Sequence, residues 1–401
     1  MTWEKVKLGD CCTSITDGDH QAPPVSESGI PFIIISDIDS FNQINFDHVR
    51  YVPIDYYNKL SVTRKPKLGD ILYTVKGSFG IPALVRENTP FTFQRDIAIL
   101  RPLQSVSSKF LYYLMKSKAF YHQADSVAIG SAQRAITLSA LRDMEVHLPE
   151  RKVQDKIASI LSAYDDLIEN NRRQMKLLEE AAERLYKEWF VKFHYPGSSN
   201  DGNFVPEDWK IKKIQDVCET IGGGTPSTKV AEYYKYGDIP WVTPTDLTNN
   251  DCLFLLDTEK KITQSGLSHS SAKMLPPYTI LMTSRATIGF FAICDFSVCT
   301  NQGFISCIPR KRLYLWYLLY NLKNRVDEVK SHAGGSTYLE ISKSVFRQFD
   351  VIIPDDEILN LFNCAIEPLM LQIKSKKKGI VLLQEARDRL LPKLMSGEVE
   401  V

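Results

Sequence analysis

The segment GSAQRAITLSALRDMEVHLP, residues 130–149, returns later in the chain as GSTYLEISKSVFRQFDVIIP, residues 335–354. Both copies begin with Gly-Ser, carry Ile, Ser, Arg and Val at matching places, and end in Pro. Both ends of the match give the same offset, 205 residues. An internal repeat of this length decides the architecture, because each copy has to form an equivalent structural unit. The sequence therefore predicts a 401-residue chain built from two related halves.

The same offset continues downstream without a gap, since residues 177–181 (LLEEA) match residues 382–386 (LLQEA). Upstream the offset drifts, and residues 71–74 (ILYT) resemble residues 280–283 (ILMT). Each half is therefore a variable domain followed by a more uniform tail.

Both tails repeat apolar residues every seven positions, which is the pattern of a long amphipathic helix. The predicted seam of the first tail is Ile157, Leu161, Tyr164, Ile168, Asn171, Leu178 and Leu185. The predicted seam of the second tail is Phe362, Ile366, Leu369, Ile373, Lys376, Leu383 and Leu390. Asn171 and Lys376 hold the same repeat position, where a polar residue can fix the register of a helix pair at some cost in stability.

Two independent surface helices are the alternative to a helix pair. Helices of roughly 40 residues would be about 60 Å long, and a seam of that length needs a partner. We therefore expect the two tails to pair as an antiparallel coiled coil with pseudo-twofold symmetry. Pro368 should kink the second helix or delay its start.

The variable parts carry short β-branched and aromatic runs between Gly and Pro residues, which favours mainly-β domains. The fold class that follows is α+β, with two tandem mainly-β heads joined by the two long helices. The predicted organisation is a first head at 1–150, a first helix at 151–192, a linker at 193–208, a second head at 209–354 and a second helix at 355–397.

The composition, with 44% hydrophobic and 24% charged residues, is that of a globular protein. The apolar stretches are too short to span a membrane, and the first residues lack the pattern of a secretory signal, so we expect a cytoplasmic protein. Eight cysteines without a CxxC pair indicate reduced, mostly buried thiols. The net charge of +1 does not by itself indicate a nucleic-acid-binding protein.

Motifs for catalysis, cofactors and metals are missing. There is no GxxxxGK[ST] phosphate loop, and the seven histidines offer no pair at metal spacing. Pro276-Pro277-Tyr278 resembles part of an amino-methyltransferase motif, but Leu275 stands where an amine-binding Asp or Asn is needed. A turn before a strand is the better interpretation of this triplet. We expect no catalytic residue, no cofactor and no metal.

The repeated halves, each with a Gly/Thr-rich or Asp-Gly loop, an Ile-Leu strand, Gly-Ser and a long amphipathic helix, resemble the specificity subunits of type I restriction-modification systems. The second half matches best, through residues 222–227 (GGGTPS), 237–242 (GDIPWV) and 301–303 (NQG). The first half departs from the pattern, with residues 16–20 (TDGDH) and Arg95-Asp96 at the corresponding places.

The resemblance implies a target recognition domain in each half, each reading one part of a split, double-stranded DNA target. It also implies that two methyltransferase subunits and, for cleavage, restriction subunits dock on this scaffold and carry the chemistry. An enzyme in its own right and a protein-only coiled-coil adaptor are the competing interpretations. Missing catalytic motifs argue against the first, and duplicated heads with divergent loops argue against the second.

DNA contacts require Arg or Lys toward guanine and Asn or Gln toward adenine, presented on loops. The candidates are Gln94, Arg95, Gln133, Arg134, Thr225, Thr228, Lys229, Ser284, Arg285, Asn301, Gln302, Ser336 and Thr337. Each of them could instead cap a turn. The glycines of residues 77–80 and 334–335 could bring backbone amides to phosphates, although tight turns explain them equally well. Arg172-Arg173 and Lys377-Lys378 could reach phosphates, but a solvated helix face is the favoured interpretation.

Overall fold

The computed structural model describes residues 3–39, 41–130, 133–198, 205–335 and 337–401. The chain divides into two compact units. The first unit contains residues 1–168 together with 382–401, and the second unit contains residues 169–381. The first head is the part of the first unit from β1 to β9, and the second head is the part of the second unit from β10 to β18.

The described residues of the first head form three sheets. A two-stranded sheet pairs β1 (Glu4–Lys7) with β9 (Glu145–Leu148). The four-stranded sheet has the order β2 (Cys12–Asp17), β8 (Ile97–Pro102), β5 (Ile71–Thr74) and β6 (Pro82–Leu84), and all its pairs are antiparallel. The three-stranded sheet has the order β4 (Arg50–Val52), β3 (Ile30–Ile33) and β7 (Thr92–Phe93), with β3 and β7 parallel. The helices are α1 (Ile54–Lys59), α2 (Ser108–Lys116), α3 (Lys118–Val127) and α4 (Leu138–Asp143), with 3₁₀ turns η1 (Leu8–Cys11), η2 (Ile35–Asp37) and η3 (Val62–Arg64).

The second head repeats this plan strand for strand. Its two-stranded sheet pairs β10 (Lys210–Lys213) with β18 (Asp350–Ile353). Its four-stranded sheet has the order β11 (Cys218–Gly222), β17 (Phe304–Pro309), β14 (Ile280–Thr283) and β15 (Phe291–Ile293), and its three-stranded sheet the order β13 (Lys260–Ile262), β12 (Ile239–Val242) and β16 (Cys299–Thr300). Its helical elements are α6 (Ile214–Val217), η4 (Ala231–Tyr233), α7 (Pro244–Thr248), α8 (Gln264–Ser268), η5 (Arg312–Tyr314), α9 (Leu315–Asn324), α10 (Val326–Ser331) and α11 (Lys343–Arg347). The identical strand order confirms the duplication seen in the sequence.

The four-stranded sheet of the first head is buried on both faces, because its strands alternate side chains between two cores. Ala98 and Leu100 of β8 join one cluster with α2, α3 and the start of α5. Ile97 and Ile99 join the other cluster, which includes the three-stranded sheet. Strands covered on both faces read as continuous apolar runs, which is why residues 97–100 are IAIL.

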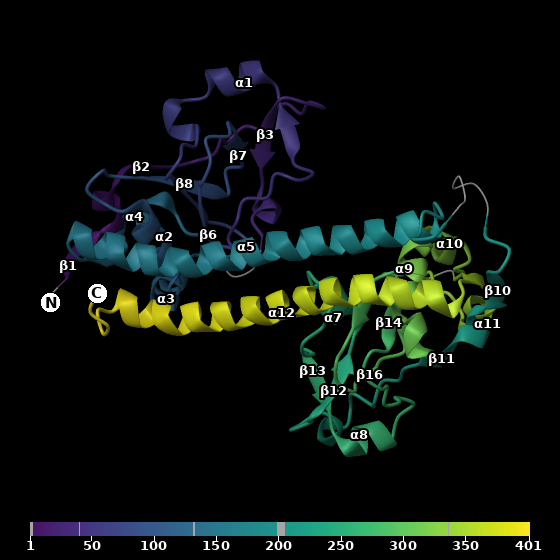
Figure 1. The fold of residues 1–401 in the computed structure, drawn as a ribbon. Coiled ribbons are helices and arrows are strands. Elements are labelled where there is room, and N and C mark those ends of the chain that lie inside the picture. Colours follow the sequence, from purple (N-terminus) through teal and green to yellow (C-terminus); the bar gives the residue numbers. More distant parts are fainter. Residues whose placement is uncertain (1–2, 40, 131–132, 199–204, 336) are drawn as a thin grey trace. The chain divides into compact units, whose positions relative to one another are not determined.

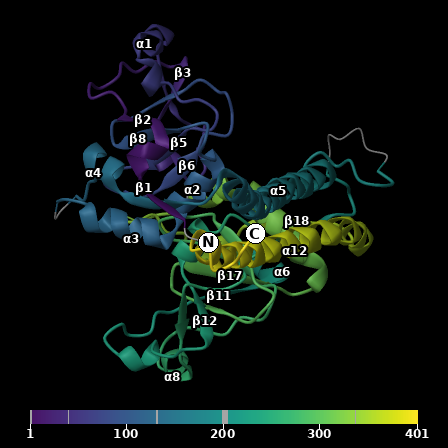
Figure 2. The ribbon, with the colours of Figure 1, turned by 90° about the vertical axis from the view of Figure 1, so that its left-hand side faces the viewer.

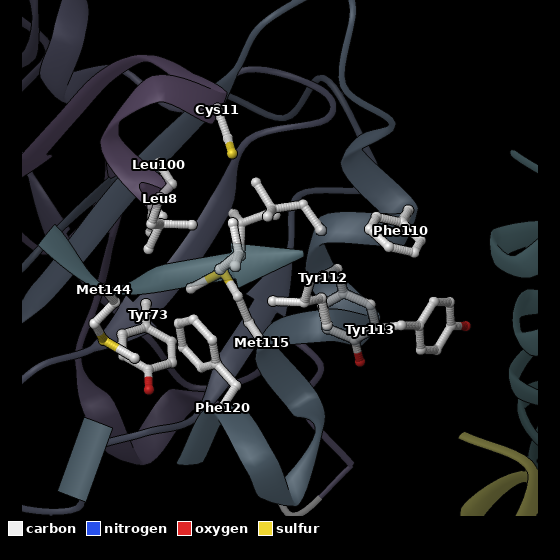
Figure 3. Packing of buried hydrophobic residues seen from close by; sticks show 14 of the residues in the cluster. Leu8, Cys11, Tyr73, Leu100, Phe110, Tyr112, Tyr113, Met115, Phe120 and Met144 are labelled. Carbon is white, nitrogen blue, oxygen red and sulfur yellow. The ribbon is translucent and has the colours of Figure 1, made fainter. Parts of the chain in front are cut away.

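The larger core of the first unit is rich in aromatic side chains (Figure 3). Tyr73 of β5 and Phe120 of α3 lie edge to face, with their ring centroids 5.8 Å apart. The three-stranded sheet and α1 lie at the end of the head that points away from α5 (Figures 1 and 2). The helical layer of the head therefore faces the long helix, and the smaller sheet lies at the far end.

The two long helices are α5 (Arg151–Phe190) and α12 (Asp356–Met395), each of 40 residues. In the first unit they run antiparallel, since Asp165 of α5 pairs with Arg387 of α12 and Ile157 shares a core with Leu394. In the second unit they also run antiparallel, since Trp189 of α5 contacts Phe362 of α12 at 5.8 Å between ring centroids, while Asn171 of α5 lies beside Gly379 of α12. The predicted α+β class with two tandem heads and two long helices is confirmed.

Pro368 lies inside α12, which begins at Asp356, so the predicted delay of the helix start is wrong. Pro368 is exposed, as is Cys364 one turn earlier. The carbonyl group that the proline leaves without an amide partner therefore belongs to the water-facing side of the helix, where solvent can satisfy it.

Candidate nucleic-acid interface

In the first head, three loops meet beyond the end of β5. The amide of Val75 donates to the carbonyl oxygen of Asp96 at 2.9 Å, and the amide of Ile136 donates to that of Val75 at 2.8 Å. The amide of Gly77 donates to the carbonyl oxygen of Arg134 at 3.1 Å. Backbone bonds thus hold the loops around residues 94–96, 75–80 and 133–136 together.

The second head contains the same arrangement beyond the end of β14. The amide of Ser284 donates to the carbonyl oxygen of Gly303 at 2.8 Å, and the amide of Ile341 donates to that of Ser284 at 3.0 Å. The amide of Ala286 donates to the carbonyl oxygen of Leu339 at 2.9 Å. Each of these bonds is the repeat equivalent of one in the first head, so both heads carry one loop cluster of the same design.

The backbone amides of the glycine-rich turns in these clusters form hydrogen bonds within the protein. Gly77 and Gly80 donate to Arg134 and Thr74, the second bond being 2.8 Å long, and Gly334 donates to the carbonyl oxygen of Glu340 at 3.0 Å. Gly77 and Gly80 also have positive φ angles of 73° and 90°, which glycine adopts at little cost. The tight-turn interpretation is therefore correct for these three amides.

In the first head, the predicted site residues fall on two loops of the cluster. Gln94 donates through Nε2 to Asp96 at 3.2 Å, and the exposed Arg95 lies 3.9 Å from the same carboxylate. On the loop before α4, Gln133 is exposed, and Arg134 forms an ion pair with Asp125 at 3.2 Å. The structure thus brings all four candidates of this head to one cluster.

Arg134 is further held by an aromatic ring. Its guanidinium lies 5.9 Å from the centre of the Phe79 ring, and Phe79 stacks on Tyr121 with an interplanar angle of 6°. The Arg134 side chain remains 43% exposed. Its position is fixed by these contacts, while the rest of the side chain is exposed to solvent.

In the second head, Thr225, Asn301 and Gln302 lie together. The Thr225 hydroxyl donates to Oε1 of Gln302, and both side chains are exposed. The amide of Gly303 donates to Oδ1 of Asn301 at 2.9 Å, which orients the Asn301 side chain. Amide groups oriented in this way are suited to hydrogen bonding with the N6 and N7 atoms of adenine.

Arg285 belongs to the same cluster. Its Nε atom is 3.8 Å from Oε2 of Glu340, its guanidinium lies 5.8 Å from the centre of the Tyr338 ring, and its side chain is 44% exposed. Ser284 is only 2% exposed, so its hydroxyl cannot reach a base in this conformation. Its backbone instead anchors the loop that carries Arg285.

Three other candidates are less closely connected. Thr228 and Lys229 are exposed on the loop between β11 and η4, beyond Thr225, and Thr337 is exposed before Tyr338. Ser336 lies outside the residues that the structure describes.

Two residues of these clusters were missed by reasoning from the sequence. Lys76 forms the same β-bridge with Ala135 that Arg285 forms with Glu340, so it is the equivalent of Arg285 in the first head. Extending the match of residues 71–74 with 280–283 by two positions would have revealed it. Tyr338 is 58% exposed beside Arg285, and only the fold brings these two together.

The basic residues in the middle of the helices have two different environments. Lys377 of α12 pairs with Asp251 of the second head, and Nε of Arg172 of α5 is 3.8 Å from the same residue. Their side chains are 16% and 15% exposed, so the solvated-face interpretation is wrong for both. Arg173 and Lys378 are 74% and 54% exposed, as that interpretation expects.

The predicted helix-seam residues differ in how deeply their side chains are buried. The deeply buried ones are Ile157, Leu161, Ile168, Phe362, Ile366 and Ile373. The half-buried ones are Tyr164, Asn171, Leu178, Leu185, Leu369, Lys376, Leu383 and Leu390. Met175, Ala182, Met370 and Ile380 are also buried on these helices.

Among the described residues there is no group of three or more His, Cys, Asp or Glu side chains placed to hold a metal ion. In the same part of the chain, no helix is both long and apolar enough to cross a bilayer. Pro277 and Tyr278 form a turn before β14, as the sequence predicted.

The sequence matches the family described as "Type I restriction modification DNA specificity domain" over residues 1–180 and 206–362. The chain therefore belongs to this family, as a specificity subunit, the non-catalytic component that determines which DNA target is recognised. Specificity subunits of type I systems bind DNA and act together with methyltransferase and restriction subunits.

Relatives match along the full chain. The type I restriction enzyme MjaIX specificity subunit of Methanocaldococcus jannaschii is 27% identical, covering 100% of this chain and 94% of the relative. The HindI specificity subunit of Haemophilus influenzae is 24% identical, covering 99% of each. The crystal structure of an S subunit from M. genitalium has the same fold, with a TM-score of 0.63 at 15% identity over 98% of this chain and 96% of that chain.

Proposed function

We propose that this specificity subunit reads a bipartite double-stranded DNA target, one half with the loop cluster of each head. The single observation that supports this is the repeated cluster itself. Equivalent backbone bonds hold it in both heads, while the side chains that it carries differ, with Gln94 and Arg95 in one head and Asn301 and Gln302 in the other. A shared frame with different side chains is suited to reading two unlike half-sites.

The proposal includes the division of the chain and its partners. Residues 1–150 and 209–354 are the two target recognition domains, and residues 151–192 and 355–397 are spacer helices that form an antiparallel coiled coil. Two methyltransferase subunits bind this scaffold, and restriction subunits join them when the DNA is cleaved. Pseudo-twofold symmetry between the heads would match the local symmetry of the duplex.

The test is sequencing of methylated DNA from cells that express the subunit with its methyltransferase. Arg285→Ala and Gln302→Ala should each relax one half-site, at a cost of about 1–3 kcal/mol per lost base contact. Lys76→Ala, at the first-head position equivalent to Arg285, is the matched control and should relax only the other half-site. Equal weakening of both half-sites by any of these variants would contradict the assignment of one head to each half.

A further inference from the structure

A buried polar cluster joins the two long helices in the first unit. Asp165 of α5 accepts hydrogen bonds from Tyr113 of α2 at 2.7 Å and from Arg387 of α12 at 2.6 Å. The side chains of Asp165 and Arg387 are only 8% and 12% exposed. Burial alone would raise the pKa of Asp165, but Lys116, the Tyr113 hydroxyl and Arg387 outweigh burial and lower that pKa.

The repeat-equivalent junction in the second unit has a different chemistry. The offset of 205 residues relates Asp165 to Met370 and Arg387 to Ala182. The hydroxyl of Tyr320 of α9 contacts Sδ of Met370 at 4.0 Å, in the place where Tyr113 contacts Asp165. Met370 and Ala182 are both fully buried. An aspartate with an arginine at one junction thus corresponds to a methionine with an alanine at the other.

The helix register in the second unit places Met370 and Ala182 at the same level. A Cβ atom added at Gly379 of α12 would lie 3.7 Å from the Asn171 amide of α5, and Trp189 contacts Phe362 further along. In antiparallel helices the residue numbers fall along α5 as they rise along α12. Counting residues in this way from either contact places Ala182 opposite Met370. Each junction therefore consists of one residue from each helix.

A duplicated chain has an alternative way to pair its helices. Because α5 and α12 are copies, α5 could pair with α5 of a second copy of the chain. Asp165 would then lie opposite Ala182 and lose Arg387, while an α12 pair would place Arg387 opposite Met370. Leaving a buried charge without its partner is strongly destabilising.

We propose that these unlike junctions restrict pairing to α5 with α12, so that a second copy of this chain cannot replace either helix with its own copy of the same helix. A polar residue within an apolar helix seam selects partners in this way by penalising the wrong pair. The complex consequently carries two different heads, and a target with two identical halves is not read.

The test uses the full chain with a Gln174→Cys reporter. In the native pairing, residue 174 lies at the level of Lys376, whereas in an α5–α5 pair it lies beside residue 174 of the second copy. The chain is refolded from urea and mildly oxidised, and dimers linked through the introduced thiol are measured on a non-reducing gel. The same chain without the reporter gives the background from the native cysteines.

Two variants make the junctions alike. Asp165→Met with Arg387→Ala makes both apolar, and Met370→Asp with Ala182→Arg makes both polar. Each variant should raise the fraction of linked dimer at least about tenfold over the reporter chain alone. In these variants neither the pairing of α5 with α5 nor that of α12 with α12 leaves a buried charge without a partner. The combination of all four substitutions exchanges the two junctions and should return the fraction to the background.

Circular dichroism confirms that each variant is folded before it is scored. Because one variant removes the buried charges and the other adds a second pair, a folding failure of one leaves the other as the test. Background levels of dimer in the folded like-junction variants would overturn the proposal, as would abundant dimer in the reporter chain alone.

Discussion

Lys116 is a basic side chain placed within the buried polar cluster of the first unit. Burial lowers its pKa from 10.5 to about 8, although Asp165 acts in the opposite direction. Between these two pH values the unfolded chain binds a proton that the folded chain does not, so stability should rise with pH across this window. Below about pH 8 the folded state carries the full cost of the buried charge.

Comparison of the wild-type chain with Lys116→Met isolates this effect from that of the buried thiols. Burial raises the pKa of Cys11 to about 11 and that of Cys12 to about 12 in the folded chain, so these thiols titrate in the same range only when the chain is unfolded. From about pH 7.5 to about pH 9.5, the free energy of unfolding of the wild type should rise relative to that of the variant by on the order of 1 kcal/mol. Urea unfolding at each pH measures it. A difference that does not change with pH would show that Lys116 titrates normally.

Single residues of the candidate interface were only partly predictable. The sequence predicts Arg285, Asn301 and Gln302 because their side-chain chemistry suits base reading and turn-forming residues surround them, and the structure places all three in one loop cluster. Ser284 meets the same criteria but is buried, because it directly follows β14, a strand whose residues are buried on both faces. Tyr338 was missed because its contact with Arg285 depends on a pairing of distant segments that no local pattern encodes.

At the scale of elements, α5 and α12 were predictable because forty residues of heptad spacing leave few alternatives. The Ile-Leu strands expected at 71–74 and 280–283 are β5 and β14. Most other short strands and helices of the heads were not located individually, since buried segments of this length carry no clear period. The ion pair between Asp251 of the second head and Lys377 of α12 could not be predicted either, because it joins residues 126 positions apart.

The long helices should act as a ruler between the half-sites. Inserting four residues between Asn171 and Leu178, and four between Lys376 and Leu383, adds about 6 Å to each helix and locally unwinds the seam. The unread spacer of the target should lengthen while the bases of both half-sites stay the same. Sequencing of methylated sites measures this. Activity with an unaltered spacer, or with altered half-site bases, would refute the ruler.

At the scale of the whole molecule, the balance of 49 basic and 48 acidic residues limits how many phosphates the chain alone can neutralise. We expect the isolated subunit to bind its target weakly and with a shallow dependence on salt. The complex with methyltransferase subunits should bind far more tightly and show a steeper slope of log K against log salt. Equally tight and specific binding by the isolated subunit would contradict this expectation.

The division of the chain between its two units also determines the order in which they can be completed during synthesis. All residues of the second unit, 169–381, leave the ribosome while the first unit still lacks residues 382–401. Those residues include Leu391 and Leu394, which are buried in the core of the first unit. The head that is translated first is therefore the last to become stable. A stop codon at position 382 should leave amide hydrogens of the second unit protected from exchange while those of the first unit lose protection.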